Sequence, residues 1–187
     1  MGGSPRRKPT RLADYDYRTP GVYFVTVVTR GRACLFGRIT EEGLVLNDLG
    51  RVVEDVWTRL PNHYPHLELD AFVVMPNHFH GLVFLKPAAP VVGEGLKPSP
   101  TANRRHGLPE IVRAFKTFSA RRINALRGTP GRRLWQRSYH DRIVRDEADL
   151  GRLREYIAAN PMRWHLDREN PAAGGEGCGG PGDGPRT

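Results

Sequence analysis

The chain has 187 residues, which suffices for one domain with a hydrophobic core and is too short for two ordinary ones. Its formal net charge of +9 favours a polyanionic partner, with nucleic acid ahead of a membrane surface. No run of eighteen apolar residues and no signal-peptide pattern is present, which argues against a membrane protein or an exported one. We therefore expect a cytoplasmic, nucleoid-associated protein of bacterial type.

Composition divides the chain into one folded domain and three polar or glycine-rich segments. Residues 1–19 are basic and contain proline, which predicts a flexible arm before a domain at residues 20–167. Inside that domain, residues 87–107 have the turn-rich composition of a mobile surface loop. The tail at residues 168–187 is rich in glycine and proline and is predicted to be disordered.

The first half of the domain predicts a strand, a hairpin and a helix. Residues 22–29 are rich in β-branched and aromatic side chains, which is typical of a strand. Residues 38–47 resemble a short hairpin that turns at a Glu-Gly pair. Asn47 is a good N-cap, and the apolar residues after it recur at helical spacing until Pro61 marks the end of a helix.

The second half predicts three more strands and two helices. Residues 67–75 and 78–85 read as strands separated by a Pro-Asn pair, because proline is tolerated at a turn and not inside a central strand. A helix with an apolar face and a basic face is predicted over 111–126. A strand at 138–145 follows, and then a helix at 146–160 that begins with acidic residues and ends before proline.

The order is thus strand, helix, strand, strand, helix, strand, with an extra hairpin early and an extra helix late. This is the split βαβ pattern of an α+β fold, ferredoxin-like or RRM-like, in which an antiparallel sheet carries helices on one face. The strand at 78–85 would be internal to the sheet. This architecture hosts RNA-binding proteins, metal carriers and enzymes, so the fold alone decides no function.

His78-Phe79-His80 places two imidazoles at the start of an apolar strand. Side chains at positions i and i+2 of a strand leave the same face, so both rings can converge on one metal ion. A solvated pair or a hydrogen-bonded core pair is the structural alternative.

The last predicted helix has a polar edge opposite its packing stripe, and this edge presents Arg152, Tyr156 and Asn160 at successive turns. A cation, a phenol and a carboxamide therefore share one side of the helix. The structural alternative is a surface tyrosine followed by an ordinary helix stop, because asparagine before proline commonly ends a helix.

The chain resembles a known family, and two elements carry the resemblance most specifically. These are PNHFHG at residues 76–81 and YIxxNP at residues 156–161. Together with the surrounding segments from about Arg11 to Trp164, they are similar to the REP-associated tyrosine transposases. These are single-tyrosine members of the histidine-hydrophobe-histidine superfamily of single-strand DNA nucleases.

The resemblance implies a divalent metal site, Mg²⁺ or Mn²⁺, made by His78 and His80 with a third ligand at Asn160, and a catalytic tyrosine at Tyr156. The spacing of Tyr156 and Asn160, one helical turn apart, agrees with this. On ligand chemistry alone, two imidazoles and a carboxamide favour Mn²⁺ or softer ions over Mg²⁺, so the preferred metal stays open. No nucleotide cofactor is expected, since the chain has no GxxxxGK[ST] loop.

The family also implies a reaction and a substrate. The reaction is endonucleolytic cleavage and rejoining of single-stranded DNA through a 5′-phosphotyrosine intermediate, on palindromic repeats folded as hairpins. One alternative is a non-catalytic protein that binds hairpin nucleic acid. Another is replication initiation or plasmid mobilisation, against which the shortness of the chain argues. The sequence leaves open whether the protein is a monomer or a homodimer, and whether the tyrosine meets the histidines of its own chain.

Basic residues concentrate in one part of the chain. Between residues 104 and 145 there are twelve Lys or Arg residues against two acidic ones, which predicts a surface for backbone phosphates. The residues expected to contact DNA, including one on the last helix, are Arg113, Lys116, Arg121, Arg132, Arg133, Arg137 and Arg152.

Several aromatic and polar residues allow a second interpretation. Phe115, Trp135 and Tyr139 are either stacking platforms for bases or ordinary core residues. Tyr139 next to His140 resembles a nucleophile with its base, but neighbours on a strand point to opposite faces and would not cooperate. Asp70 is a candidate for orienting a metal-bound histidine.

Overall fold

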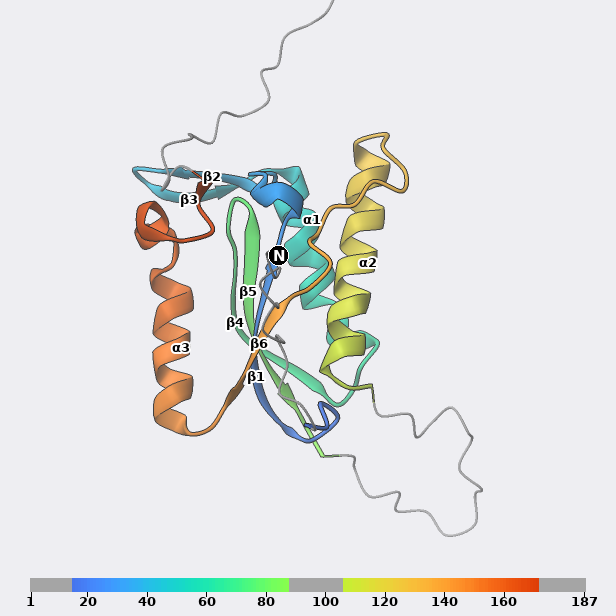
Figure 1. Ribbon diagram of the computed structural model, residues 1–187, viewed down its shortest axis with the longest axis vertical. Helices are drawn as coiled ribbons and strands as arrows, with labels where there is room; N and C mark the ends of the chain where they lie inside the picture. Colours follow the sequence, from blue (N-terminus) through green and yellow to red (C-terminus); the bar gives the residue numbers. More distant parts are fainter. Residues whose placement is uncertain (1–14, 88–105, 172–187) are drawn as a thin grey trace, which may run out of the picture.

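A computed structural model describes residues 15–87 and 106–171, and its centre is a four-stranded antiparallel sheet (Figure 1). The strand order is β4-β5-β1-β6, with both helical crossovers of the ferredoxin-like α+β fold, which confirms the predicted class. The strands are β1 (Gly21–Val28), β4 (Leu67–Val74), β5 (His78–Leu85) and β6 (His140–Val144). The predicted histidine-bearing strand, β5, is internal as expected, between β4 and β1.

Helices cover both faces of this sheet (Figure 1). On one face lie α1 (Asp48–Thr58) and α2 (Leu108–Leu126), and α1 begins at the predicted N-cap, where the Asn47 side chain accepts a hydrogen bond from Gly50 N. The opposite face carries α3 (Glu147–Ala159), which packs through Leu150, Leu153 and Ile157 against Leu82 of β5. The C-terminal helix therefore stands apart from the two crossover helices.

A small hairpin lies at one end of the sheet, as the sequence predicts. It consists of β2 (Gly37–Thr40) and β3 (Gly43–Leu46), and Gly43 has a φ of 121°, which favours glycine. The 3₁₀ segment η3 (Pro161–Leu166), which follows α3, lies beside this hairpin (Figure 1).

The buried face of α2 differs from the predicted one. Phe118 and Leu126 belong to the apolar residues of the predicted helix, yet they are 44% and 64% exposed. Ser119 is buried instead, because its hydroxyl bonds to the Phe115 carbonyl oxygen and accepts a hydrogen bond from the indole N–H of Trp135. A small polar residue with two partners thus takes a place that the apolar pattern assigned to larger ones.

Two ion pairs at the surface link the helices to their neighbours. Arg122 of α2 pairs with Asp55 of α1. Arg154 of α3 pairs with Asp70 of β4 at 2.8 Å, and Asp70 also accepts a hydrogen bond from Ala71 N. Asp70 therefore holds α3 and orients no histidine, contrary to expectation.

The folded part extends beyond residues 20–167 on both sides. Tyr17 is buried in the main core. Glu169 and Asn170 are buried after η3: the carbonyl oxygen of Glu169 accepts a hydrogen bond from Asn77, and the side-chain amide of Asn170 donates one to the carbonyl oxygen of Trp164. The rest of the predicted arm and tail, and nearly all of the predicted loop at 87–107, lie outside the described residues. Among the described helices, none combines the length and the apolar character needed to cross a bilayer.

Gly81 of β5 allows α1 to approach the sheet, and this leads to a stability prediction. A Cβ atom at Gly81 would lie 2.6 Å from Cζ2 of Trp57 and 2.8 Å from the ring of Phe79. We expect Gly81→Ala to lower the free energy of unfolding by about 1–3 kcal/mol, measured by urea denaturation. Gly151→Ala in α3 is the control, because a Cβ there meets nothing within 4 Å, and it should instead stabilise by about 0.5–1 kcal/mol. Equal effects of the two substitutions would contradict the packing argument.

Candidate active site

The two predicted metal-binding histidines lie side by side beneath α3. His78 and His80 point to the face of β5 that also carries Leu82, and they are 0% and 4% exposed. Their ring centroids are 4.5 Å apart. The period-two geometry of the strand thus brings the rings together as the sequence predicts, and the solvated alternative is wrong.

A buried carboxamide fixes the orientation of His78. Asn77 donates hydrogen bonds from Nδ2 to the carbonyl oxygens of Arg32, at 3.0 Å, and Glu169, at 2.5 Å. Its Oδ1 therefore faces Nδ1 of His78, at 2.9 Å, and accepts a hydrogen bond from it. Nδ1 carries the proton in this arrangement, so Nε2 of His78 presents a lone pair.

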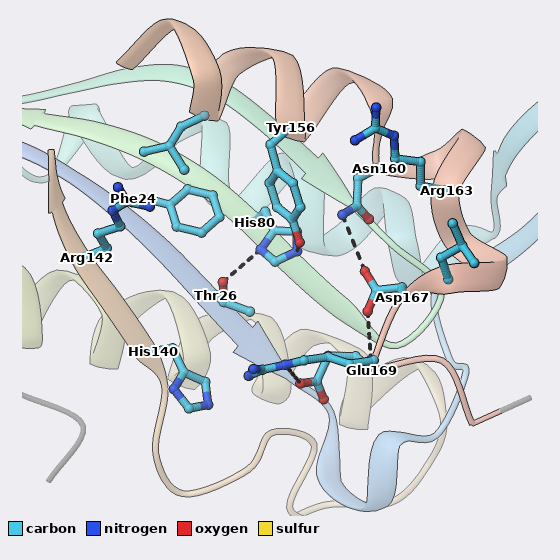
Figure 2. Close-up of a pocket in the computed structure, with 13 residues that line it drawn as sticks. Phe24, Thr26, His80, His140, Arg142, Tyr156, Asn160, Arg163, Asp167 and Glu169 are labelled. Carbon is cyan, nitrogen blue, oxygen red and sulfur yellow. Dashed lines mark hydrogen bonds and ion pairs between the residues drawn. The ribbon is translucent and has the colours of Figure 1, made fainter. Parts of the chain in front are cut away.

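His80 is held by the neighbouring strand. Nδ1 lies 2.8 Å from Oγ1 of Thr26, its partner in the β1–β5 register. Nε2 lies 3.3 Å from the hydroxyl oxygen of Tyr156, which descends from α3 (Figure 2). Both imidazoles thus have one nitrogen engaged by a supporting residue and the other directed to the same side, which is the usual arrangement of metal-binding histidines.

The sequence of α3 explains how Tyr156 reaches this position. Asp146 caps the helix by accepting a hydrogen bond from Asp149 N, and the apolar stripe then fixes the rotation of α3 on the sheet. The ring of Tyr156 lies over Phe24 and His80, with centroid distances of 6.0 and 5.3 Å, and the residue remains 40% exposed. Tyr156 therefore meets the histidines of its own chain.

Asn160 completes the polar edge, and an unpredicted acid joins it. Asn160 is 3% exposed, and its Nδ2 lies 3.4 Å from Oδ2 of Asp167. The same carboxylate oxygen lies 3.8 Å from Nε2 of His78. Sequence reasoning missed Asp167, since its approach to the histidines depends on the turn made by η3, and no spacing rule links it to them.

The residues present fit a divalent metal ion. Nε2 of His78 and Oδ1 of Asn160 are buried and have no hydrogen-bond partner among the described residues, which is rare for polar atoms in a folded protein. One donor atom from each of His78, His80 and Asp167 lies within 4.8 Å of the others. Lone pairs of nitrogen and oxygen that converge in this way suit a cation such as Mn²⁺ or Mg²⁺.

Burial keeps these imidazoles neutral. It lowers the pKa of His78 to about 4, although Asp167, Glu169 and Asn160 oppose the shift, and it lowers the pKa of His80 well below its usual value. Burial, followed by the charge of Asp167, raises the pKa of Tyr156, so its phenol holds its proton at neutral pH. The site therefore presents two uncharged imidazoles and a protonated phenol.

A cavity of about 540 Å³ opens onto Tyr156 and His80. Figure 2 shows Phe24, Thr26 and Asn160 around the tyrosine, with His140 and Arg142 on the β6 side. Arg142 is fixed by Asp149, at 2.7 Å, and the guanidinium groups of Arg163 and Arg168 also line the cavity. The lining therefore combines three arginines with the carboxylates of Asp167 and Glu169.

Comparisons with known proteins agree with this geometry. No family model matches the chain. A protein of Haemophilus influenzae without assigned function is 35% identical over 178 residues, which cover 89% of this chain and 94% of that protein. A second protein of that organism, named as a candidate REP-associated tyrosine transposase, is 26% identical over 149 residues, covering 79% of this chain and 74% of its own length.

The solved structure of a REP-associated tyrosine transposase bound to a REP hairpin has the same fold. Its TM-score is 0.52, at 18% sequence identity, with 84% of this chain and 77% of that chain covered. The chain thus resembles the REP-associated tyrosine transposases in sequence and in fold. The expected resemblance is confirmed.

The basic residues that the sequence assigns to DNA binding fall into two groups. Arg113, Arg121, Arg132, Arg133 and Arg137 are exposed, as a phosphate-binding surface requires. Lys116 instead donates from Nζ to the carbonyl oxygens of Gln136, at 2.7 Å, and Arg137, at 3.0 Å. Arg152 pairs with Asp149 at 3.1 Å and is not among the residues that line the cavity next to Tyr156. These two contacts differ from the free cations expected from the sequence.

A second cavity, of about 560 Å³, is lined by Arg30, Arg133, Trp135, Gln136 and Arg137. Its three arginines form no ion pair with an acidic residue in the described part of the chain. Main-chain hydrogen bonds from Arg30 N to Leu134 O and from Gln136 N to Val28 O join its walls to the end of β1. The cavity is therefore basic and built on rigid backbone.

The aromatic residues with two interpretations belong to the core. Phe115 and Trp135 have ring centroids 5.8 Å apart and, like Tyr139, are less than 10% exposed. Their burial supports the core interpretation, although Trp135 also lines the second cavity. His140, the neighbour of Tyr139, is exposed and lines the cavity next to Tyr156.

Burial of His78 predicts sensitivity to acid. The folded pKa of about 4 lies below the unfolded value of 6.5, so the unfolded chain binds more protons and stability falls as the pH drops from 6.5 toward 4. Between pH 7 and pH 5 this group should cost about 2 kcal/mol. Urea unfolding with a chelator at both pH values should show this loss in the wild type and a smaller one in His78→Gln. The exposed His165→Gln is the control, and an identical loss in all three proteins would contradict the argument.

Proposed function

We propose that this protein is a REP-associated tyrosine transposase, that is, a metal-dependent endonuclease and strand transferase that acts on single-stranded, hairpin-forming DNA. The observation that supports this most directly is the 3.3 Å distance between the Tyr156 hydroxyl and Nε2 of His80. A phenol of the same chain thereby lies next to a pair of buried, neutral imidazoles, at the wall of a cavity that three arginines also line. These are the parts that tyrosine attack on a phosphodiester requires.

The proposed reaction is a transesterification. Oη of Tyr156 attacks the phosphorus atom, the bond from phosphorus to the 3′ oxygen breaks, and a 5′-phosphotyrosine forms. The phenol loses its proton to water in the open cavity, and the departing 3′ oxygen takes one up as a hydroxyl group. Attack on the phosphotyrosine by another 3′-hydroxyl reverses these steps and joins the strands, so no nucleotide cofactor is consumed.

His78, His80 and Asn160 would hold the divalent cation, Mg²⁺ or Mn²⁺. When bound, the cation would supply positive charge that polarises the phosphate and offsets the raised pKa of Tyr156. The supporting residues have the complementary task. Asn77 and Thr26 hold the imidazoles so that each keeps a nitrogen directed at the cation.

The proposed substrate is hairpin DNA from palindromic repeats, met at the nucleoid. A REP hairpin is bound by the relative of known structure. In this chain, the net charge of +9 and the second cavity, with its three unpaired arginines, favour a polyanion that extends beyond the catalytic cavity. One strand could thus be held at two places at once.

The nucleophile can be tested by trapping. Wild-type protein incubated with labelled single-stranded hairpin oligonucleotides and Mn²⁺ should give a covalent adduct that survives denaturing electrophoresis. Tyr156→Phe should give none, since it lacks the attacking oxygen, yet should bind the hairpin as tightly as the wild type. His78→Ala should lose cleavage and keep most of the binding.

An adduct that persists in Tyr156→Phe would disprove the nucleophile assignment. Tyr139→Phe is the matched control, because it also removes one phenolic oxygen but from a residue of the core. Tight hairpin binding by the wild type without cleavage on any repeat of its own genome would favour the non-catalytic alternative.

The arginines of the second cavity can be tested through salt dependence. Arg133→Ala and Arg137→Ala should each weaken hairpin binding and reduce the slope of log affinity against log salt by about one, because each removes one phosphate contact. Fluorescence anisotropy at several salt concentrations measures this slope.

Arg51→Ala on α1 is the control with the same change of charge, from an exposed residue that lines neither cavity. If its slope falls as much as that of Arg133→Ala, net charge alone explains the effect and the cavity has no special role.

A further inference from the structure

We propose that Asp167 is a fourth ligand of the divalent cation, in addition to His78, His80 and Asn160. This inference rests on the proposed function, since it assumes that a cation binds there. It concerns a residue outside the tyrosine helix, contributed by the segment that follows η3.

The first argument is position. Oδ2 of Asp167 lies 3.8 Å from Nε2 of His78, and this nitrogen is a buried atom without a hydrogen-bond partner. The Asp167 side chain is only 8% exposed, so its charge is largely removed from water. Within the described part of the chain, the hydrogen bond that Oδ2 accepts is long, at 3.4 Å from Nδ2 of Asn160. A buried carboxylate with so weak a partner calls for a cation.

The second argument is how the carboxylate is held. Oδ1 of Asp167 accepts a hydrogen bond from Glu169 N at 2.7 Å, which leaves Oδ2 directed at the histidines. Glu169 in turn pairs with Arg32 at 3.0 Å, and its carbonyl oxygen accepts the hydrogen bond from Asn77 that orients His78. The segment that carries Asp167 therefore also sets the tautomer of a neighbouring ligand.

The added carboxylate changes which ions suit the site. Two imidazoles and a carboxamide are neutral donors that favour Mn²⁺ or softer ions, whereas carboxylate oxygens suit Mg²⁺ and Mn²⁺. In a six-coordinate ion, four protein donors leave two positions for oxygens of the DNA. The negative charge also offsets half of the charge of the cation.

The test is metal binding by the full chain, measured by titration calorimetry without DNA. Asp167→Asn keeps an oxygen that can accept the Glu169 N–H bond and removes only the charge. We expect its affinity for Mn²⁺ to fall by about 10-fold or more, and its affinity for Co²⁺ to fall less, because imidazole dominates the binding of the softer ion. Glu155→Gln is the control, since it makes the same charge change at an exposed position of α3.

A second variant covers the case in which asparagine itself binds the ion or the first variant folds poorly. Asp167→Ala should reduce the Mn²⁺-induced rise in melting temperature that the wild type and Glu155→Gln show. Unchanged Mn²⁺ affinity in both variants would overturn the proposal and leave Asp167 as a cap of its own turn. Adduct formation by the wild type would still stand in that case, so the proposed function would survive. A wild-type protein that forms the adduct but binds no cation would overturn this inference and the metal requirement together.

Discussion

The side-chain amide of Asn77 joins three parts of the chain, and the geometry of the site depends on it. It is fully buried and bonds to the carbonyl oxygen of Arg32 after β1, to the carbonyl oxygen of Glu169 after η3, and to the imidazole of His78. Because all of these bonds are removed from water, leaving any of them unmade would cost the full desolvation of its partner. The turn between β4 and β5, the C-terminal segment and the first histidine are thus fixed relative to one another.

The unfavourable free energy of this arrangement is concentrated at the site itself. Nε2 of His78 and Oδ1 of Asn160 stay unpaired, and the burial that depresses both imidazole pKa values disfavours their charged forms. A fold selected for stability alone would place apolar residues there. Neutral imidazoles with free lone pairs, however, are what a cation binds, so the unfavourable burial and the proposed chemistry have one cause.

Sequence reasoning succeeded where the relevant distance follows from a local repeat. The two histidines share a face because strands alternate, and Tyr156 and Asn160 share an edge because they are one helical turn apart. The N-cap at Asn47 and the order of the elements follow from equally local signals. The family resemblance supplied the roles, which periodicity alone left open.

It failed where a side chain finds its partner across the fold. The Lys116 ammonium donates to the main-chain oxygen of Gln136, 20 residues along the chain. Ser119 lies in the core because its hydroxyl accepts a hydrogen bond from Trp135. Asp167 approaches the histidines only because η3 turns the chain back toward the β2–β3 hairpin. No rule of sequence spacing predicts these contacts. Composition and periodicity alone therefore assign the residues to other roles or to none.

The two faces of the sheet divide stability from chemistry. The face under α1 and α2 carries the large aromatic core, with Trp57, Phe79 and Phe115 in mutual contact, and its packing leaves no room even at Gly81. The face under α3 has a much smaller apolar cluster, reinforced at the edge by the Arg154–Asp70 pair. A well-packed face makes the strands rigid, and this rigidity lets the opposite face devote its positions to two imidazoles and to an open cavity. The apolar cluster and the ion pair therefore fix α3 on the sheet, while Tyr156 remains exposed at the cavity.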